Sequence, residues 1–362
     1  MRFARPLEAY EQQSLGEQKE AGRAAPVPSI YDIRDTKQLT KAGPSELVAM
    51  VPDKGRPPIV LPKRIPESIA GAIADAEMIH VHGHTGTAKT GFFEALAYVP
   101  ENWKALCALR GIKHKPLRVF PVEMVDFDTI SEMYYRRAIR DGQTYDEPSC
   151  IVNAIMESRK VMDDVYPVIW LREIGRVSTA AIQGGLLNLM TQGFTRISDQ
   201  SMVSGAGIAW FADSNYHTDA TSTHILVTQD DALKRRWTVN IAFDFPSPEQ
   251  EVEIIRYLMK TGYLPATDEG LVLKIVELGG VLRAQRVQGN LLSMAPPTIY
   301  GYCSFIRQAV RDPHYALPDI ANLTLLGSAN QEDRDAAQSL FCEVFGFRRE
   351  TTNTVTAGGD LV

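Results

Sequence analysis

The residues best suited to chemistry lie in one short segment, from residue 83 to residue 91. Its sequence, Gly-His-Thr-Gly-Thr-Ala-Lys-Thr-Gly, fits the phosphate-binding pattern G-x-x-x-x-G-K-[ST] except that alanine replaces the second glycine. Backbone N–H groups and the positive end of the following helix stabilise a phosphate in such a loop, and one extra methyl should be tolerated. We therefore expect a nucleotide-phosphate site composed of Gly83, His84, Thr85, Gly86, Thr87, Ala88, Lys89, Thr90 and Gly91.

Two of these residues have specific expected roles. Lys89 would reach the β- and γ-phosphates of ATP, and the Thr90 hydroxyl would be a ligand of Mg²⁺. A glycine-rich turn that binds nothing can have the same short pattern. The strand-like residues 78–82 before the segment and the helix-like residues 92–97 after it favour the phosphate site, because the motif needs both elements around it.

Strand-like and helix-like segments alternate through the middle of the chain. Strands are expected at residues 78–82, 117–122, 167–171, 207–212 and 238–243, and helices after Lys89 and at residues 150–163 and 180–190. This alternation predicts a parallel sheet with helices on both faces and a nucleotide at the carboxyl ends of the strands. From residue 249 onward the pattern is mainly helical.

The predicted fold class is therefore α/β, with a P-loop NTPase core built as an αβα parallel sheet and followed by a smaller, mainly helical lid domain. We place an N-terminal extension or arm, rich in Pro, Gly, Lys and Glu, at residues 1–58. The nucleotide-binding domain is expected at residues 59–247, and the helical lid with a C-terminal segment at residues 248–362.

Composition restricts the class of protein. The 362 residues are 44% hydrophobic and 23% charged, which is typical of globular proteins. No membrane-spanning run or apolar signal sequence is found, so we expect a cytoplasmic protein without a membrane partner. A net charge of −6 disfavours broad nucleic-acid binding. The four scattered cysteines suggest buried thiols, and His80, His82 and His84 lack the acidic or cysteine neighbours of a metal site.

ATP hydrolysis needs more than a phosphate loop: a carboxylate beside the metal, a group that polarises water, and a cation for the developing charge. Glu173, at the end of an apolar strand, is the candidate base, and Asn215, at the end of another, could sense the γ-phosphate. The basic turn at residues 234–236 could offer an arginine to the nucleotide of a neighbouring subunit. A strand-end Glu is also commonly a solvated or capping group, and the basic turn could be solvated or contact nucleic acid.

The order of these motifs resembles the AAA+ ATPases, and more narrowly the MoxR group, which includes CbbQ-, NorQ- and GvpN-like proteins. The resemblance extends over residues 59–310. It implies that Asn215 is the sensor residue and that Arg236 is the trans-acting arginine, with Arg235 as its alternate. It also implies a self-associating ring, usually a hexamer, in which ATP and Mg²⁺ at each subunit interface drive remodelling of a protein client. In this family the remodelling often acts through a partner protein that carries a von Willebrand A domain.

The sequence departs from the MoxR pattern at the acidic motif. Arg172 stands where the family has the metal-side Asp, and a positive charge there would repel Mg²⁺ unless the side chain turns away. Glu123, Asp126 and Asp128 could supply a compensating carboxylate, although they could equally be ordinary surface or helix-start acids. Efficient hydrolysis is therefore not assured by the sequence.

A second departure concerns the lid arginine that the family usually offers as a second sensor. This chain has Ala-Pro-Pro-Thr at residues 295–298 and keeps arginines nearby, at Arg283 and Arg286. The second sensor is therefore expected to be missing or relocated.

Three functional classes follow from these observations. The leading one is a MoxR-like AAA+ ATPase that forms a ring and remodels or activates a protein partner. The second is a nucleotide-gated scaffold with ATP clamped between subunits and little turnover, which Arg172 favours. The third is an ATP-dependent DNA-coating protein, which the acidic balance of the chain disfavours. The client and the subunit count are not determined by the sequence.

Overall fold

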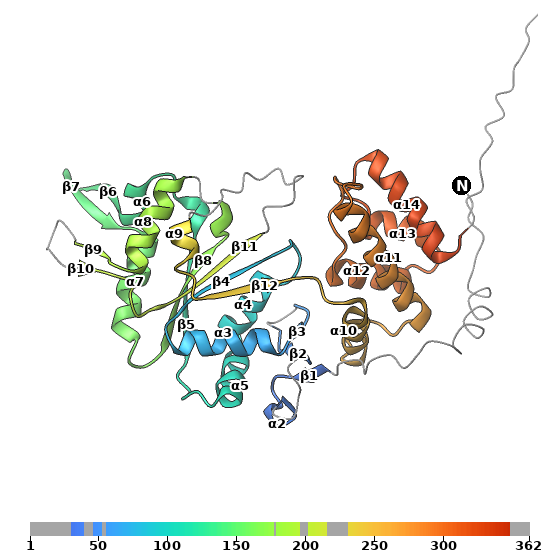
Figure 1. Ribbon diagram of the computed structural model, residues 1–362, viewed down its shortest axis with the longest axis horizontal. Coiled ribbons are helices and arrows are strands. Elements are labelled where there is room, and N and C mark those ends of the chain that lie inside the picture. The colour runs from blue at the N-terminus through green and yellow to red at the C-terminus, as the bar shows by residue number, and fades with distance from the viewer. Residues whose placement is uncertain are drawn as a thin grey trace, which may run out of the picture. The chain divides into compact units, whose positions relative to one another are not determined.

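The computed structural model describes residues 30–39, 46–52, 56–176, 179–195, 202–215 and 231–347, and Figure 1 shows the chain as a ribbon. The chain divides into two compact units, one formed by Pro28–Phe245 and one containing the described residues from Pro246 onward. The units separate after Phe245, close to the boundary expected after residue 247. Each unit is described separately below.

A five-stranded parallel sheet forms the centre of the first unit. Its strands lie in the order β12-β4-β11-β8-β5. Their bounds are Met78–Gly83 (β4), Leu117–Glu123 (β5), Tyr166–Arg172 (β8), Ala209–Asn215 (β11) and Val239–Phe243 (β12). All four neighbouring pairs are parallel, so the carboxyl ends of the five strands lie along one edge of the sheet.

Helices cover both faces of this sheet, because successive side chains of each strand point to opposite faces. One apolar core joins the sheet to α3 (Arg64–Ala74), α4 (Lys89–Tyr98) and α5 (Pro100–Arg110). The other joins it to α6 (Ile130–Tyr134), α7 (Cys150–Val161), α8 (Ala180–Met190) and α9 (Asp231–Lys234). In Figure 1 these two groups of helices lie on opposite sides of the sheet. The three-layer αβα arrangement expected from the sequence is confirmed.

The described residues before Ile59 belong to the first unit, which begins earlier than the expected boundary. They form β1 (Ile30–Asp32), α2 (Thr36–Leu39) and β2 (Leu47–Met50), and β2 pairs antiparallel with β3 (Ile59–Pro62). Val48 and Met50 are buried in the same apolar core as α3 and α4. Burial of these apolar side chains explains why this segment folds with the sheet unit, although its composition suggested an extended arm.

Short hairpins extend the first unit. Strands β6 (Tyr135–Arg140) and β7 (Gln143–Pro148) pair antiparallel around Asp141 and Gly142, both of which have positive φ. An Asp-Gly pair is typical of the two-residue hairpin turn, which requires this backbone conformation. A second small pair is formed by β9 (Phe194–Thr195) and β10 (Met202–Val203).

The described part of the second unit is helical. It contains α10 (Pro248–Lys260), α11 (Glu269–Val287), α12 (Ile299–Arg311), α13 (Leu317–Thr324) and α14 (Gln331–Phe345). Its buried side chains include Ile255, Leu278, Phe305 and Phe341. The expected fold class, a parallel α/β core followed by a mainly helical part, is thus confirmed. Among the described residues no helix combines the length and the apolar character that crossing a membrane would require.

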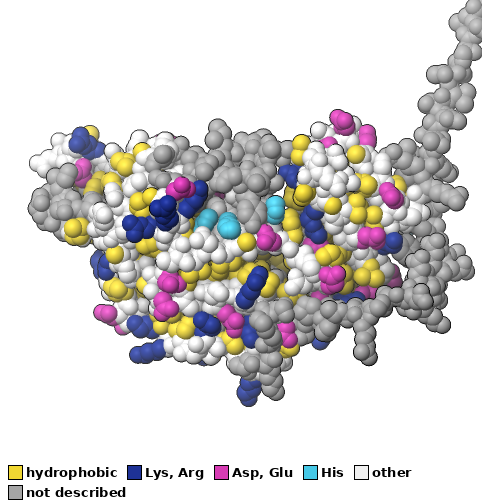
Figure 2. All heavy atoms as spheres, in the orientation of Figure 1, with side chains coloured by type: hydrophobic (Ala, Val, Ile, Leu, Met, Phe, Trp, Pro, Cys, Tyr) yellow, Lys and Arg dark blue, Asp and Glu magenta, His cyan; other side chains and the backbone are white. Residues whose placement is uncertain are grey.

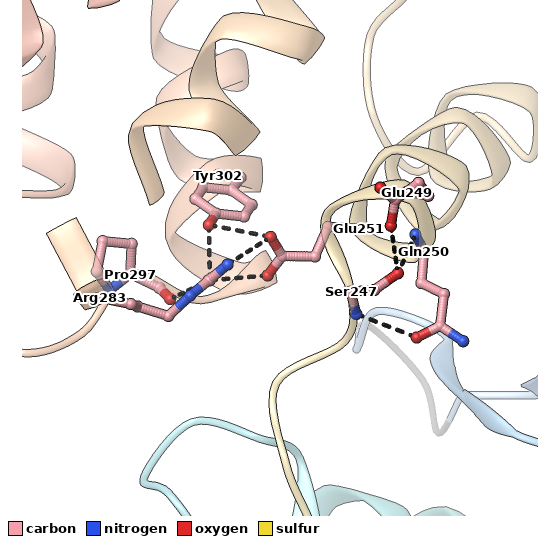
Figure 3. A network of polar contacts seen from close by, with 7 residues as sticks. All are labelled: Ser247, Glu249, Gln250, Glu251, Arg283, Pro297 and Tyr302. Atoms are coloured by element: carbon pink, nitrogen blue, oxygen red, sulfur yellow. Dashed lines mark hydrogen bonds and ion pairs between the residues drawn. The ribbon is translucent and has the colours of Figure 1, made fainter. Parts of the chain in front are cut away.

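Polar side chains bind three helices of this unit together (Figure 3). Glu251 of α10 is fully buried and accepts two hydrogen bonds from Arg283 of α11, both 2.8 Å long. Arg283 also donates to the hydroxyl of Tyr302 of α12 at 2.8 Å and to the carbonyl of Pro297 at 3.1 Å. Ser247 caps the start of α10 by accepting from the N–H of Gln250. The buried carboxylate is therefore fully paired, as a charge in an apolar interior must be.

Cysteine exposure differs in one respect from expectation. Cys107, Cys303 and Cys342 are buried, whereas Cys150 is exposed at the first position of α7. Ser149 caps this helix, and the apolar side chains that follow it face the core.

Candidate nucleotide-binding site

The loop from residue 83 to residue 91 connects β4 to α4, as the sequence predicts. Gly83 ends β4, and a Cβ atom at this position would lie 2.1 Å from the carbonyl oxygen of Phe243 on β12. Gly83 is therefore required by the close approach of the neighbouring strand. His84 stacks on Phe245 with ring centroids 5.0 Å apart, and Thr85 and Gly86 are exposed at the tip of the loop.

Lys89 lies at the first position of α4, and its side chain turns back into the loop. Only 6% of the residue is exposed, and the ammonium donates to the carbonyl oxygens of Gly83 at 2.9 Å and His84 at 2.7 Å. Burial lowers the pKa of Lys89 to about 8, and the nearby Asp213 carboxylate partly offsets this effect. The cation is thus held by the backbone at the mouth of the loop.

The start of α4 leaves backbone donors facing the loop. Ala88, its N-cap, has φ 67° and provides no side-chain hydrogen bond to the helix. The first four N–H groups of any α-helix lack a partner within the helix, so they are free to bind an anion. Thr87 is largely buried, and its hydroxyl donates to the carbonyl of His84 at 2.8 Å. A Cβ atom at Gly91 would lie 3.4 Å from the Ile59 side chain. The expected loop residues therefore form one structural feature around the helix start.

Asp213 is the acidic side chain that faces this loop. It lies on β11, only 3% of it is exposed, and its Oδ2 accepts a hydrogen bond from the Thr90 hydroxyl at 2.8 Å. Its Oδ1 accepts from the Trp170 indole at 3.2 Å and from the backbone N–H of Glu173 at 3.1 Å. Lys89, Thr90 and Asp213 thus form a compact polar group at the carboxyl ends of β4 and β11.

No role was predicted for Asp213, because strand alternation alone does not show which helix covers its face of β11. Residues 211 and 213 lie on the same face of β11, and Phe211 stacks on Phe93 of α4 with centroids 3.7 Å apart. Phe93 and Thr90 are three positions apart on α4, so they share one helix face. The same alternation therefore brings Asp213 to Thr90.

Arg172 turns away from the loop between β4 and α4. Its guanidinium lies 2.6 Å from Glu123, which is its registered neighbour on β5, and 4.9 Å from the centre of the Trp170 ring. Glu123 therefore pairs with Arg172, and Asp126 and Asp128 are exposed. None of these three acids is the side chain bonded to Thr90, so the expectation that one of them compensates for Arg172 is not supported by the contacts.

Glu173 follows β8 directly and lies beside the polar group. Its backbone has φ 53°, and its N–H donates to Asp213 as described. Its carboxylate pairs with Arg176 at 2.9 Å. The residue predicted as the base is therefore adjacent to the loop, with its side chain held by an arginine three residues later.

Asn215 and the two arginines lie at different ends of the sheet. Asn215 ends β11 and is paired in register with Gly83, which brings it to the start of the loop. Arg235 and Arg236 are exposed between α9 and β12, at the amino end of the sheet. Strand β12 then extends over four residue steps to Phe243 beside Gly83, a rise of about 13 Å. These arginines therefore do not approach the loop of their own chain.

Figure 2 shows Lys and Arg side chains gathered over the part of the first unit where Figure 1 labels α9. Lys234, Arg235 and Arg236 are all exposed there, and Lys234 pairs with Asp231 at 3.3 Å. A basic surface is thus present at the amino end of the sheet.

The alternating histidines have separate surroundings. His80 is buried on β4 with Nε2 2.8 Å from the Ser214 hydroxyl, and it stacks on Trp237. Burial lowers the pKa of His82, with opposing effects from Asp244, which raises it, and Lys89, which lowers it further. Within the described residues no group of three or more His, Cys, Asp or Glu side chains could hold a metal ion by itself.

The two lid arginines considered as relocated sensors are engaged within the helical unit. Arg283 is bound to Glu251 and Tyr302, and Arg286 donates to the backbone carbonyls of Leu292 at 2.7 Å and of Met294. A buried guanidinium held by a carboxylate would leave that carboxylate uncompensated if it moved. Arg283 is therefore a structural residue of this unit.

Comparisons with known proteins give a distant structural likeness and no family. No protein-family model matches the sequence, and no curated protein matches it. A crystal structure of a candidate ATPase from Cytophaga hutchinsonii is similar with a TM-score of 0.35 and 14% identity, covering 79% of this chain and 90% of that chain. This likeness is too remote to bear on function.

The polar groups around this loop are suited to binding a nucleoside triphosphate and Mg²⁺. The buried ammonium of Lys89 and the open N-terminus of α4 are suited to phosphate oxygens. The hydroxyl of Thr90 and the carboxylate of Asp213 are hard oxygen ligands of the kind that Mg²⁺ prefers. Phosphate oxygens and water usually complete the coordination of this ion, so a cluster of three acidic side chains is not needed.

Proposed function

We propose that the protein binds ATP with Mg²⁺ at the loop between β4 and α4 and hydrolyses it. The observation that carries this proposal is the polar group of Lys89, Thr90 and Asp213 at the carboxyl edge of a parallel sheet. In open α/β sheets this edge is where ligands bind, and here it coincides with a helix N-terminus. A bound Mg²⁺ would neutralise charge on the β- and γ-phosphates.

The protein's own residues have distinct parts in this proposal. The N–H groups at the start of α4 and the Lys89 ammonium hold the triphosphate, and Thr90 binds the metal. Glu173 orients the attacking water once its carboxylate leaves Arg176. Asn215 approaches the γ-phosphate from the end of β11.

We further propose that the protein acts as a MoxR-like AAA+ ring that remodels a protein partner. Support comes from the exposed Arg235 and Arg236, which are at the other end of β12 from the loop of their own chain. If these arginines complete a nucleotide site, it is that of a neighbouring subunit. A ring, and most simply a hexamer, would bring each basic turn to a neighbour's nucleotide.

A nucleotide-gated scaffold with little turnover is the second candidate. It is favoured by the ion pair between Glu173 and Arg176, which occupies the carboxylate that would polarise water. In that case ATP stabilises the assembly between subunits and is released slowly.

Nucleotide binding tests the proposal first. Lys89→Ala should weaken ATP binding by roughly 10- to 100-fold in isothermal titration calorimetry, because it removes charge-assisted hydrogen bonds to phosphate. The matched control is Lys104→Ala, which removes an exposed lysine from α5 and should leave the affinity unchanged. Undiminished affinity in Lys89→Ala, or no binding of ATP by the wild type at millimolar concentration, would overturn the proposal.

Phosphate release and particle mass then separate the two candidates. The remodelling ATPase predicts steady phosphate release that Glu173→Gln and Arg236→Ala abolish, together with an ATP-dependent ring in native mass spectrometry. A ring that retains ATP without releasing phosphate would identify the scaffold instead.

A further inference from the structure

We propose that Asp213 is the metal-side carboxylate of this site, replacing the acid that Arg172 displaces from β8. By metal-side carboxylate we mean the acid that accepts the hydrogen bond of the loop threonine and faces Mg²⁺ in the nucleotide complex. This inference rests on the proposed function and specifies how its site holds the metal.

Asp213 is held next to the loop threonine. It is nearly fully buried, and Thr90, the loop residue with the metal-binding hydroxyl, donates to its Oδ2 at 2.8 Å. A buried carboxylate is costly unless its oxygens are satisfied. Oδ1 is satisfied by two N–H donors, from Trp170 and from the backbone of Glu173. These two donors fix the carboxylate so that its other oxygen is directed at Thr90.

On the neighbouring strand β8, Arg172 is directed away from Asp213. Arg172 ends β8 on the face that holds Trp170, and its guanidinium extends toward Glu123 on the far side of β8 from β11. The positive charge is thus paired on the β5 side, and the negative charge is provided on the β11 side. An exchange of this kind keeps a carboxylate next to Thr90 while β8 carries a cation.

The local charges are consistent with a cation ligand at this point. Lys89 is close enough to Asp213 for the carboxylate to oppose the lowering of the lysine pKa. When Lys89 binds phosphate oxygens, the hard oxygen atoms of Asp213 and Thr90 remain to bind a divalent cation. Asp213 therefore contributes to Mg²⁺ affinity and needs no direct contact with the nucleotide.

The test measures how Mg²⁺ changes the affinity for ATP, without relying on turnover. ATP affinity is measured at increasing Mg²⁺ concentrations for the wild type, for Asp213→Asn and for the matched control Asp163→Asn, which changes an exposed acid of the same unit. Loss of a metal-site carboxylate should raise the Mg²⁺ midpoint by about 10- to 100-fold in Asp213→Asn only. Affinity for ATP in EDTA should be no weaker in Asp213→Asn than in the wild type, which shows that the loop is folded.

The outcomes distinguish this inference from the proposed function. If the wild type binds Mg²⁺-ATP and Asp213→Asn keeps the same Mg²⁺ midpoint, the metal-side assignment is wrong and nucleotide binding stands. If Glu123→Gln shifts the midpoint and Asp213→Asn does not, the carboxylate is Glu123. If the wild type binds no ATP, the proposed function itself fails. Should Asp213→Asn not fold, Asp213→Ser removes the same charge, retains a hydroxyl acceptor and gives the same test.

Discussion

Lys89 is the residue on which the proposed nucleotide binding depends most, and its surroundings make it sensitive to pH. The ammonium is buried and bound by two backbone carbonyl oxygens, and burial lowers its pKa to about 8. An exposed lysine, with a pKa near 10.4, keeps its proton well above that value. In the free protein Lys89 therefore loses its charge as the pH rises through about 8.

From the lowered pKa of Lys89 we predict that ATP affinity depends on pH. A bound triphosphate stabilises the ammonium, so the complex holds a proton that the free protein has lost above pH 8. Affinity should therefore be constant below pH 7.5 and fall by up to tenfold for each pH unit above about 8. Calorimetry at pH 9 in buffers of different ionisation enthalpy should detect proton uptake on binding. A constant affinity between pH 7 and pH 9.5 would contradict the assignment.

Helix α4 is the element that delivers Lys89 and Thr90 to the loop, and it begins at a strained residue. Ala88 has the left-handed conformation, with φ 67°, which a side chain makes unfavourable by about 1–2 kcal/mol. The sequence pattern expects glycine here, and the structure gives the reason. The extra methyl is accommodated, as expected, at a cost in backbone strain.

Ala88→Gly should therefore stabilise the protein. Relief of strain outweighs the greater freedom of glycine in the unfolded chain, for a net gain of roughly 0.5–1 kcal/mol in the free energy of unfolding. Ala95→Gly, in the interior of the same helix, should destabilise by at least about 0.5–1 kcal/mol. Urea denaturation of the two variants compares them directly, and equal signs for the two changes would show that the backbone at Ala88 is unstrained.

At the scale of the molecule, the two units are stabilised differently. The sheet unit has two apolar cores, one on each face of the sheet. The helical unit contains a buried polar network of Glu251, Arg283 and Tyr302. Removing one partner of a buried ion pair leaves the other charge uncompensated. The stability of the helical unit should therefore depend strongly on Arg283.

Arg283→Ala should destabilise the helical unit by about 3–5 kcal/mol. Arg256→Ala breaks the exposed pair with Glu269 on the same unit and should cost at most about 1 kcal/mol. Hydrogen exchange of the full chain measures the difference, with protection lost first in α10, α11 and α12 of the Arg283 variant. Equal loss of protection in the two variants would show that the buried network is not important for stability.

Much of the fold could be predicted because its signals are local. The expected helix at residues 180–190 is α8, and the strand expected at residues 78–82 is β4 with one further residue. These segments have the period of their element and clear turn residues at their ends. The hairpin around Asp141 and Gly142 has an equally local turn signal, but polar strands with little apolar alternation obscured it.

The sequence by itself determined the strand-turn-helix loop that we propose binds phosphate, because Gly83, Lys89 and Thr90 lie within one local unit and their spacing is sufficient to predict it. Only the tertiary structure decided which acid meets Thr90, since Asp213 is 123 residues from it in the chain. That contact depends on β4 and β11 being neighbours in the sheet. Arg172 of β8 is paired with Glu123 of β5, on the other side of β8 from β11. Strand order is set by crossover connections and burial over the whole sheet, so it cannot be predicted from a motif in one segment.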